Sequence, residues 1–289
     1  MLTASKSLRR AATSGHPLPR VEALHDLYDR GVAWRAGQLW MATGRPGAGK
    51  SFLAQWLVSE WAAAARRDDE ICRGIYFFMD GTPFTAAIRQ AAWVTGHQTT
   101  KIVEALEGAG AGFYEEALED VADIAFVYDK KPEMPQIQET VDAYVELWDA
   151  YPQWMIFDNL RNMAGGDEGH EAKKFVLSEL QSLAYRTGSS VGVLHHASES
   201  GVRDYSKPPR ADQTEDKVTQ YPEMVLSVAK DPDSDRFQVA VNKLRDGGAS
   251  DPAAEHPVTL YADFSRVVFT DKQPARPMVQ AWPTPNYQE

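Results

Sequence analysis

The stretch from Gly44 to Ser51 reads G-R-P-G-A-G-K-S and constrains the fold more than any other part of the chain. It matches the pattern G-x-x-x-x-G-K-[ST] at every fixed position. Its glycines let the backbone turn tightly, so that successive N–H groups point inward at phosphate oxygens. Such a loop needs a strand before it and a helix after it. Residues 38–43 are apolar and residues 51–67 have a helical pattern that ends in two arginines, so both requirements are met.

The loop predicts that the chain binds a nucleoside triphosphate, ATP or GTP, together with Mg²⁺. Lys50 brings a positive charge to the terminal phosphates, and the hydroxyl of Ser51 can serve as a ligand for Mg²⁺. The other nucleotide contacts are expected from the rest of the loop and from the residue that follows it, namely Gly44, Arg45, Pro46, Gly47, Ala48, Gly49 and Phe52.

The length and composition fit a protein with a substantial core. The chain has 289 residues, 43% of them hydrophobic, which suffices for one large α/β domain with arms or for two small domains. No apolar run approaches the length of a membrane span. Cys72 is the only cysteine, which excludes an internal disulfide framework and predicts a reducing, cytoplasmic location. The net charge of −11 argues against a nucleic-acid coat, although a ring can be acidic outside and basic in its channel.

Strand-like and helix-like segments alternate after the loop. We expect strands at 74–79, 124–128, 153–157 and 189–196, and helices at 84–96, 101–110, 113–121, 134–150 and 171–186. In the last of these helices one face is expected to be apolar, with Ala172, Phe175, Val176, Leu180, Leu183 and Ala184. Four strand-like segments then follow in close succession between 223 and 270. The pattern predicts an α/β fold with a mainly parallel twisted sheet, flanked by helices and extended at one edge by antiparallel strands.

One domain is expected between residues 31 and 271. Residues 1–30 are predicted to form an arm that is basic before Glu22. A transit peptide, a DNA-touching arm, a disordered tail and a subunit-docking arm all fit that composition, and we favour one of the last two. Residues 272–289 contain four prolines and are predicted to be an unpacked C-terminal tail.

Two carboxylates follow strand-like segments and are candidates for chemistry. Asp158 comes at the end of the 153–157 strand and is the expected magnesium-side aspartate. Asn159 follows it, and an amide cannot take a proton from water, so the base must lie elsewhere. Asp80, just beyond the 74–79 strand, is the candidate. His195 and His196 end another strand, and because neighbouring strand residues face opposite ways, only one of them can point at the nucleotide.

Taken together, these motifs resemble RecA-like ATPases, and specifically the DnaB-type replicative helicases and the short plasmid helicases of RepA type. Asp80 is followed nine residues later by Arg89, which the resemblance implies helps to hold the nucleotide. The segment "VGVLHHAS" is similar to the strand whose polar end senses the γ-phosphate, which implies His196 as the sensor and His195 as a packing residue. Both histidines could instead form local hydrogen bonds only.

The segment "FQVAVNKLRDG" is similar to the K-x-R-x-G motif of the same family. The resemblance implies that Lys243 and Arg245 reach into the ATP of a neighbouring subunit, whereas a solvated strand edge is the alternative interpretation. One departure concerns Asp80, because the family usually has glutamate there. No N-terminal domain of the primase-recruiting kind is expected, so the chain resembles a helicase core of plasmid or bacteriophage type.

The resemblance covers about Val32 to Asp271 and implies a homo-hexameric ring that uses ATP and Mg²⁺ to move along single-stranded DNA in replication, with primase or other replication proteins as candidate partners. Two alternatives remain open. One is a RecA-like recombination or annealing ATPase that forms filaments. The other is an ATP-switched loader or regulator that does not unwind DNA.

The expected DNA contacts lie in two loops. Residues 198–221 form a long polar stretch without periodicity, in which Arg203, Lys207 and Arg210 are the candidate phosphate contacts. A second channel loop is expected at 161–170, with Arg161 as its only unambiguous cation. Acids in the first stretch bring its charge close to neutral, so a mobile surface loop without a ligand is the alternative.

Overall fold

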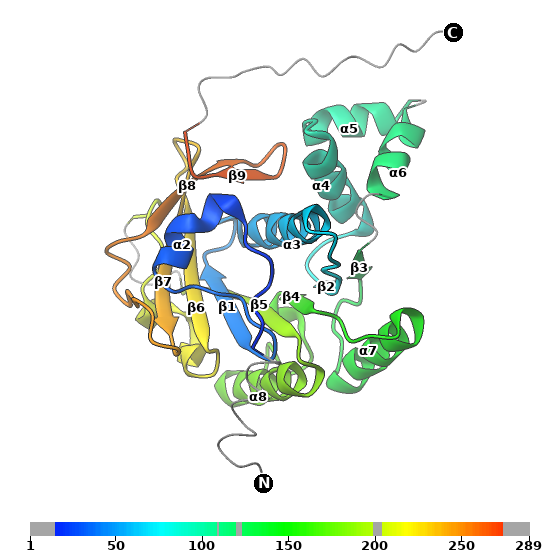
Figure 1. The fold of residues 1–289 in the computed structure, drawn as a ribbon. Coiled ribbons are helices and arrows are strands. Elements are labelled where there is room, and N and C mark those ends of the chain that lie inside the picture. The colour runs from blue at the N-terminus through cyan, green and yellow to red at the C-terminus, as the bar shows by residue number, and fades with distance from the viewer. Residues whose placement is uncertain (1–14, 109, 120–122, 199–203, 274–289) are drawn as a thin grey trace.

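The computed structural model describes residues 15–108, 110–119, 123–198 and 204–273. They form a nine-stranded sheet with the strand order β3-β2-β4-β5-β1-β6-β7-β8-β9 (Figure 1). The strands are β1 (Leu39–Gly44), β2 (Gly74–Phe78), β3 (Ile124–Val127), β4 (Trp154–Asp158), β5 (Ser190–His196), β6 (Met224–Lys230), β7 (Arg236–Leu244), β8 (Val258–Asp263) and β9 (Val268–Thr270).

The pairing of the strands confirms the predicted sheet. All strands from β3 to β6 in this order pair in parallel, and β7, β8 and β9 extend the sheet in antiparallel fashion. Of the four closing strands, β6 is therefore not an antiparallel addition but a parallel neighbour of β1. Since parallel strands point the same way, their carboxyl ends meet at one edge, which is where polar residues can gather.

Helices cover both faces of the sheet (Figure 1). One face packs against α2 (His25–Asp29), α3 (Lys50–Arg67) and α4 (Pro83–Thr95), and α5 (Thr99–Leu106) and α6 (Ala111–Glu119) pack beside α4. The opposite face packs against α7 (Met134–Trp148) and α8 (His170–Thr187). Short 3-10 turns complete the described elements: η1 (Glu22–Leu24), η2 (Leu160–Asn162), η3 (Ala211–Gln213) and η4 (Glu215–Gln220). Burial on both faces explains why the central strands read as continuous apolar runs.

Part of the expected N-terminal arm belongs to the packed structure. The side chains of Leu18, Val21, Leu24 and Leu27 are buried in the core on the α3 side of the sheet. Pro17 also forms an isolated bridge with Arg35. Leu24 of η1 and Leu27 of α2 are three residues apart, which turns both toward the same side, and Leu18 and Val21 precede η1. Packing therefore begins well before residue 31, and the outer boundaries of the domain remain a prediction.

Two further expectations need correction. Phe175 of α8 is 65% exposed, because the buried stripe of this helix runs through Leu177 instead. The stretch 198–221 is also not a structureless loop where it is described, since it contains η3 and η4. Val218 of η4 is buried in the core beside α8, and a bridge joins Ala197 to Thr214.

Among the described residues, no helix has both the length and the apolar content that a membrane crossing would require. Cys72 is buried, as a small hydrophobic residue beside a strand should be, and burial raises the pKa of its thiol to about 12.

Candidate nucleotide-binding site

The loop between β1 and α3 has the geometry that the motif predicts. Gly47 and Gly49 adopt φ values of 75° and 89°, in the left-handed region that favours glycine. A Cβ added at Gly49 would lie 2.8 Å from the ring of Phe264, so packing also requires glycine at that position. Helix α3 begins at Lys50, directly after this turn. The free N–H groups of its first turn therefore lie next to the loop, as an anion site requires.

Lys50 lies folded against its own loop. Its Nζ donates hydrogen bonds of 2.9 Å to the backbone carbonyls of Gly44 and of Arg45, and lies 3.5 Å from Nδ1 of His196. The side chain is only 7% exposed. This burial lowers the pKa of Lys50 to about 8, although two nearby carboxylates raise it. An incoming phosphate would have to replace the two carbonyls as the partner of the ammonium group.

Asp158 and Ser51 lie together, as the metal prediction requires. Asp158 ends β4 and is almost completely buried. Its carboxylate accepts a hydrogen bond from the Ser51 hydroxyl and one of 3.0 Å from Oη of Tyr76. Burial raises the pKa of Asp158, and these two hydrogen bonds lower it. A hydroxyl beside a carboxylate is the donor set that Mg²⁺ takes in phosphate sites, with phosphate oxygens and water filling its other positions. Ser51 and Asp158 therefore fit the ion.

Asp80 lies in the turn after β2 and is exposed. Two amides reach its carboxylate: Nδ2 of Asn159 lies 3.3 Å from Oδ2, and Nδ2 of Asn162 lies 3.4 Å from Oδ1. Neither amide is among the residues predicted from the sequence, Asn159 because an amide is no base. The position of Asn159, directly after the metal-side aspartate, is the signal that could have identified it. The two amides orient the carboxylate that is expected to polarise water.

The two histidines at the end of β5 face opposite ways. The register of the sheet puts His196 level with Gly44, and its ring lies beside Lys50. Burial, and next the charge of Lys50, lower the pKa of His196 to about 4, so its ring is neutral at pH 7. His195 is fully buried, and its Nε2 lies 3.0 Å from the carbonyl oxygen of Glu215. His195 is therefore packed in the core and His196 lies beside the phosphate loop, and the sensing role of His196 remains a prediction.

Arg89 and Phe52 form a second layer beside the loop. The guanidinium of Arg89 lies 4.0 Å from the ring centroid of Phe52, and Phe52 packs edge-on against Phe264 at 5.2 Å. Burial lowers the pKa of Arg89. Phe52 thus lies at the start of α3, next to Lys50 and Ser51, and Arg89 reaches it from α4.

Arg45 connects the phosphate loop to the 204–213 segment. Its NH2 group donates a hydrogen bond of 2.9 Å to the carbonyl of Asp204, and its guanidinium lies 4.2 Å from the ring centroid of Tyr205. Pro46 and Gly47 form the exposed tip of the loop, and Ala48 is half-buried. From the sequence, Arg45 is expected only as a position of the phosphate loop, and this contact is not predicted.

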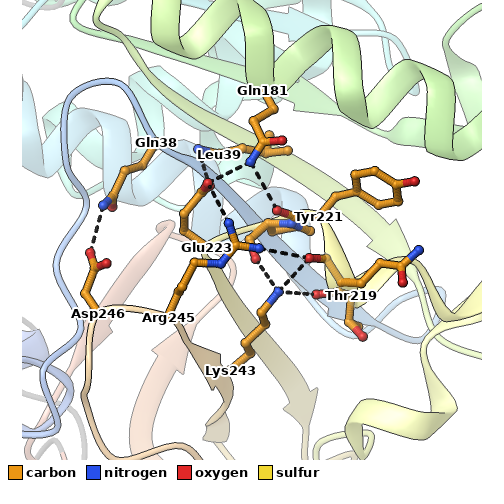
Figure 2. A network of polar contacts seen from close by, with 11 residues as sticks. Gln38, Leu39, Gln181, Thr219, Tyr221, Glu223, Lys243, Arg245 and Asp246 are labelled. Carbon is orange, nitrogen blue, oxygen red and sulfur yellow. Dashed lines mark hydrogen bonds and ion pairs between the residues drawn. The ribbon is translucent and has the colours of Figure 1, made fainter. Parts of the chain in front are cut away.

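Lys243 and Arg245 lie away from this cluster. In the sheet register Lys243 is level with Val225 of β6, and Val225 is level with Met41 of β1. Because β7 runs antiparallel to β6, the chain from Lys243 to Arg245 leads away from Gly44. At about 3.3 Å per residue, Arg245 is therefore roughly 16 Å along the strands from the start of the phosphate loop. Both side chains bind to polar groups of their own chain there, level with the amino-terminal ends of the parallel strands (Figure 2).

The candidate DNA contacts are only partly described. Arg203 lies outside the described residues. Lys207 and Arg210 are exposed, but each is paired with an acid of the same segment: Lys207 with Asp204 at 3.7 Å, and Arg210 with Asp212 at 3.1 Å. Arg161 of η2 is also exposed. These pairs reduce the local positive charge, and the role of all four residues in DNA binding remains a prediction.

Comparison with known proteins gives one family model and two phage relatives. A family model described as an AAA domain matches residues 6–202. The Gene 65 protein of Mycobacterium phage L5 is 28% identical over 267 residues, which are 88% of this chain and 93% of that protein. The Gene 65 protein of Mycobacterium phage D29 is 27% identical over 189 residues, 62% of this chain and 79% of the relative.

Solved structures share the fold over nearly the whole chain. One of them, described as an ATPase domain, superposes with a TM-score of 0.72 at 12% identity, over 93% of this chain and 98% of that one. A DnaB-like replicative helicase, described with its interactions with primase, superposes with a TM-score of 0.72 at 13% identity, over 92% of this chain and 67% of that one. At such identities the likeness establishes the fold, which is the RecA-like fold of these ATPase domains.

Proposed function

This chain belongs to the AAA domain family of ATPases and has the RecA-like fold of DnaB-like replicative helicases, and from that premise we propose that it is an ATP-driven DNA helicase that acts as a ring on single-stranded DNA. One observation carries the proposal. The nucleotide-site residues gather at the carboxyl ends of the parallel strands, namely Lys50, Ser51, Asp80 and Asp158. Arg245 lies level with the opposite, amino-terminal ends of these strands. An ATP site that needs Arg245 can then be completed only by a second copy of the chain.

Within one subunit the residues divide the work of phosphoryl transfer. Lys50 and the loop N–H groups bind the phosphates, and Ser51 and Asp158 would hold Mg²⁺, whose charge offsets that of the phosphates when it is bound. Asp80, oriented by its two amide neighbours, polarises the attacking water. His196, kept neutral by burial beside Lys50, meets the terminal phosphate and responds to its loss. Little covalent work falls to the protein in this reaction, so positioning accounts for most of the effect.

Between subunits, Arg245 of one copy would reach the ATP of the next. A ring built from identical head-to-tail contacts gives every subunit the same interface, and a homo-hexamer is the form we propose. An arginine aimed at the γ-phosphate stabilises charge that spreads in the transition state, which is worth roughly 10³-fold or more in rate.

The nucleotide site contacts both candidate DNA loops. The backbone N–H of Arg161 donates to Oδ1 of Asn159, the same residue whose amide reaches Asp80. On the other side, Arg45 binds the backbone of the 204–213 segment. These contacts support a coupling between ATP and DNA, in which a few cations per subunit suffice because a ring multiplies them. Primase and other replication proteins are candidate partners.

A second candidate function is favoured by the ion pairs of the 204–213 segment. Because Lys207 and Arg210 are both paired with neighbouring acids, the segment offers little free positive charge. An ATP-switched loader or regulator that does not unwind DNA would need no such charge.

The test measures ATP turnover with and without single-stranded DNA, beside displacement of a strand from a forked duplex, with Lys50→Ala as the inactive control. We expect DNA to stimulate turnover, strand displacement to require ATP, and DNA affinity to fall steeply with salt. Turnover without any displacement would support the loader instead. Single-particle images should show closed rings, and filaments would favour a recombination ATPase.

A further inference from the structure

The ammonium group of Lys243 is fully engaged with its own chain. Its Nζ lies 2.8 Å from the carbonyl oxygen of Thr219, 2.9 Å from that of Gln220 and 2.7 Å from that of Pro222 (Figure 2). These contacts use every N–H donor of an ammonium group. They lie at the end of η4, where the last carbonyls of a helical turn lack partners within the turn. Lys243 therefore fixes the path from η4 into β6 and has no donor left for a phosphate.

Glu223 lies at the same junction and binds β1, α8 and the turn that follows β7. Its Oε2 accepts a 3.0 Å hydrogen bond from the backbone N–H of Leu39, at the start of β1. Its Oε1 lies 2.7 Å from Nε2 of Gln181 on α8 and 3.3 Å from NH1 of Arg245 (Figure 2). The Glu223 side chain is mostly buried, so its position is set by contacts rather than by solvent.

The side chain of Arg245 is held by fewer contacts, both of them with the 220–223 segment. Besides Glu223, its NH2 group donates a 3.1 Å hydrogen bond to the carbonyl of Gln220, and the side chain is 49% exposed. A guanidinium has more N–H donors than these two contacts use. Arg245 can therefore keep its contact with Glu223 and still present donors to a phosphate outside its own chain.

We infer that Glu223 and Lys243 are positioning residues for Arg245, and that Arg245 alone is presented to the nucleotide of the neighbouring subunit. The inference rests on the trans-acting role proposed above and divides the pair that the sequence motif treats as equal. Glu223 also links Arg245 to the strand β1 of its own subunit. Because it binds the first residue of β1, it ties Arg245 to the strand that ends in the phosphate loop of the same subunit.

Glu223→Gln tests the inference, since the amide has nearly the same shape and lacks the charge. We expect kcat for ATP to fall between about 10-fold and 10²-fold, the scale of a misplaced catalytic group, with the KM for ATP unchanged. Asp246→Asn is the matched control. It removes one carboxylate directly after Arg245, in an exposed contact with Gln38 at 2.8 Å, and should leave kcat unchanged.

Mixed rings show on which side of the interface the defect lies. Arg245→Ala mixed with Lys50→Ala should regain turnover, because some interfaces then combine an intact loop with an intact arginine. Glu223→Gln should be rescued by Lys50→Ala in the same way, because its defect would also lie on the side presented to the neighbour. A Glu223→Gln protein without such rescue would show that Glu223 acts within its own subunit and would overturn the inference. If Glu223→Gln does not fold, Gln181→Met disturbs the same carboxylate and should give the same rescue with a smaller loss.

Lys243→Met tests whether Lys243 stabilises the η4–β6 junction while Arg245 contacts the nucleotide of the neighbouring subunit. If Lys243 fixes the η4–β6 junction, the nucleotide-free variant should have a Tm several degrees lower, whereas Arg245→Met should have an unchanged one. An unchanged Tm for Lys243→Met, with turnover lost and rescued in mixed rings, would instead place Lys243 at the phosphate. Full turnover by Arg245→Ala would refute the trans-acting role itself. Full turnover by Glu223→Gln, with Arg245→Ala inactive, would refute only the positioning role.

Discussion

The affinity for ATP should depend on pH in a range where ATP itself does not titrate. Lys50 is buried against the carbonyls of its own loop, and burial lowers its pKa from 10.5 to about 8. Bound phosphates favour the charged ammonium and should raise the pKa of Lys50 again. ATP binding above pH 8 must then take up a proton. Affinity is therefore complete below the pKa of the free protein and is lost as the pH rises through it.

The size of the effect follows from the pKa of Lys50. At about pH 9 only about one-tenth of the free protein carries a charged Lys50, and at pH 10 about one-hundredth. Each pH unit above about 8 should therefore raise the Kd for ATP about tenfold, or about 1.4 kcal/mol, until the pKa of the bound state is reached. Because the side chain is only 7% exposed, solvent screening does not remove this cost. The terminal phosphate has its second pKa near 6 and adds no slope in this range.

Calorimetric titration of ATP between about pH 7.5 and pH 9.5 checks this slope, and buffers of different ionisation enthalpy report the proton that is taken up. Lys50→Arg is the control, since a guanidinium stays charged throughout, so its affinity should be weaker and nearly flat. A flat profile for the unmodified protein, with the fold intact by circular dichroism, would refute the buried state of Lys50. An equal slope in Lys50→Arg would assign the titration to another group.

Substitutions at Asp80 and at two glycines of the phosphate loop test the remaining geometry. Asp80→Asn should leave ATP binding intact and lower single-turnover hydrolysis by roughly 10²-fold or more, the scale of a lost general base, whereas Asp80→Glu should keep much of the activity; unchanged hydrolysis in Asp80→Asn would place the base elsewhere. Gly49→Ala meets both a left-handed φ and the ring of Phe264, so it should lower stability by about 1–3 kcal/mol and impair ATP binding. Gly47→Ala has the strained φ without the contact and should have the smaller effect in a thermal melt; the reverse order would contradict the packing of Phe264.

Most of the fold could be predicted because its signals are local. The central strands are apolar throughout, since both faces of the sheet are covered, and α4 and α8 end at glycines with left-handed φ. The segment 211–220 could not be predicted in the same way. Its 3-10 turns have too few residues for an amphipathic period, and distant contacts hold them in place: His195 binds the carbonyl of Glu215, and Lys243 binds that of Thr219.

In the candidate site, too, some features could be predicted from local sequence and others depend on distant contacts. The phosphate loop is one contiguous segment, so its geometry can be predicted from its local sequence alone. Asp158 and His196 end parallel strands and Asp80 closely follows one, and a topology that brings the carboxyl ends of these strands together also brings the side chains together. The motif that contains Lys243 and Arg245 predicts two cations on one face, and both do contact Gln220. Which cation has donors to spare, however, depends on the carbonyl groups that lie around it. Those belong to a turn more than twenty residues earlier in the chain, so the difference between the two cations arises only when η4 packs against β7.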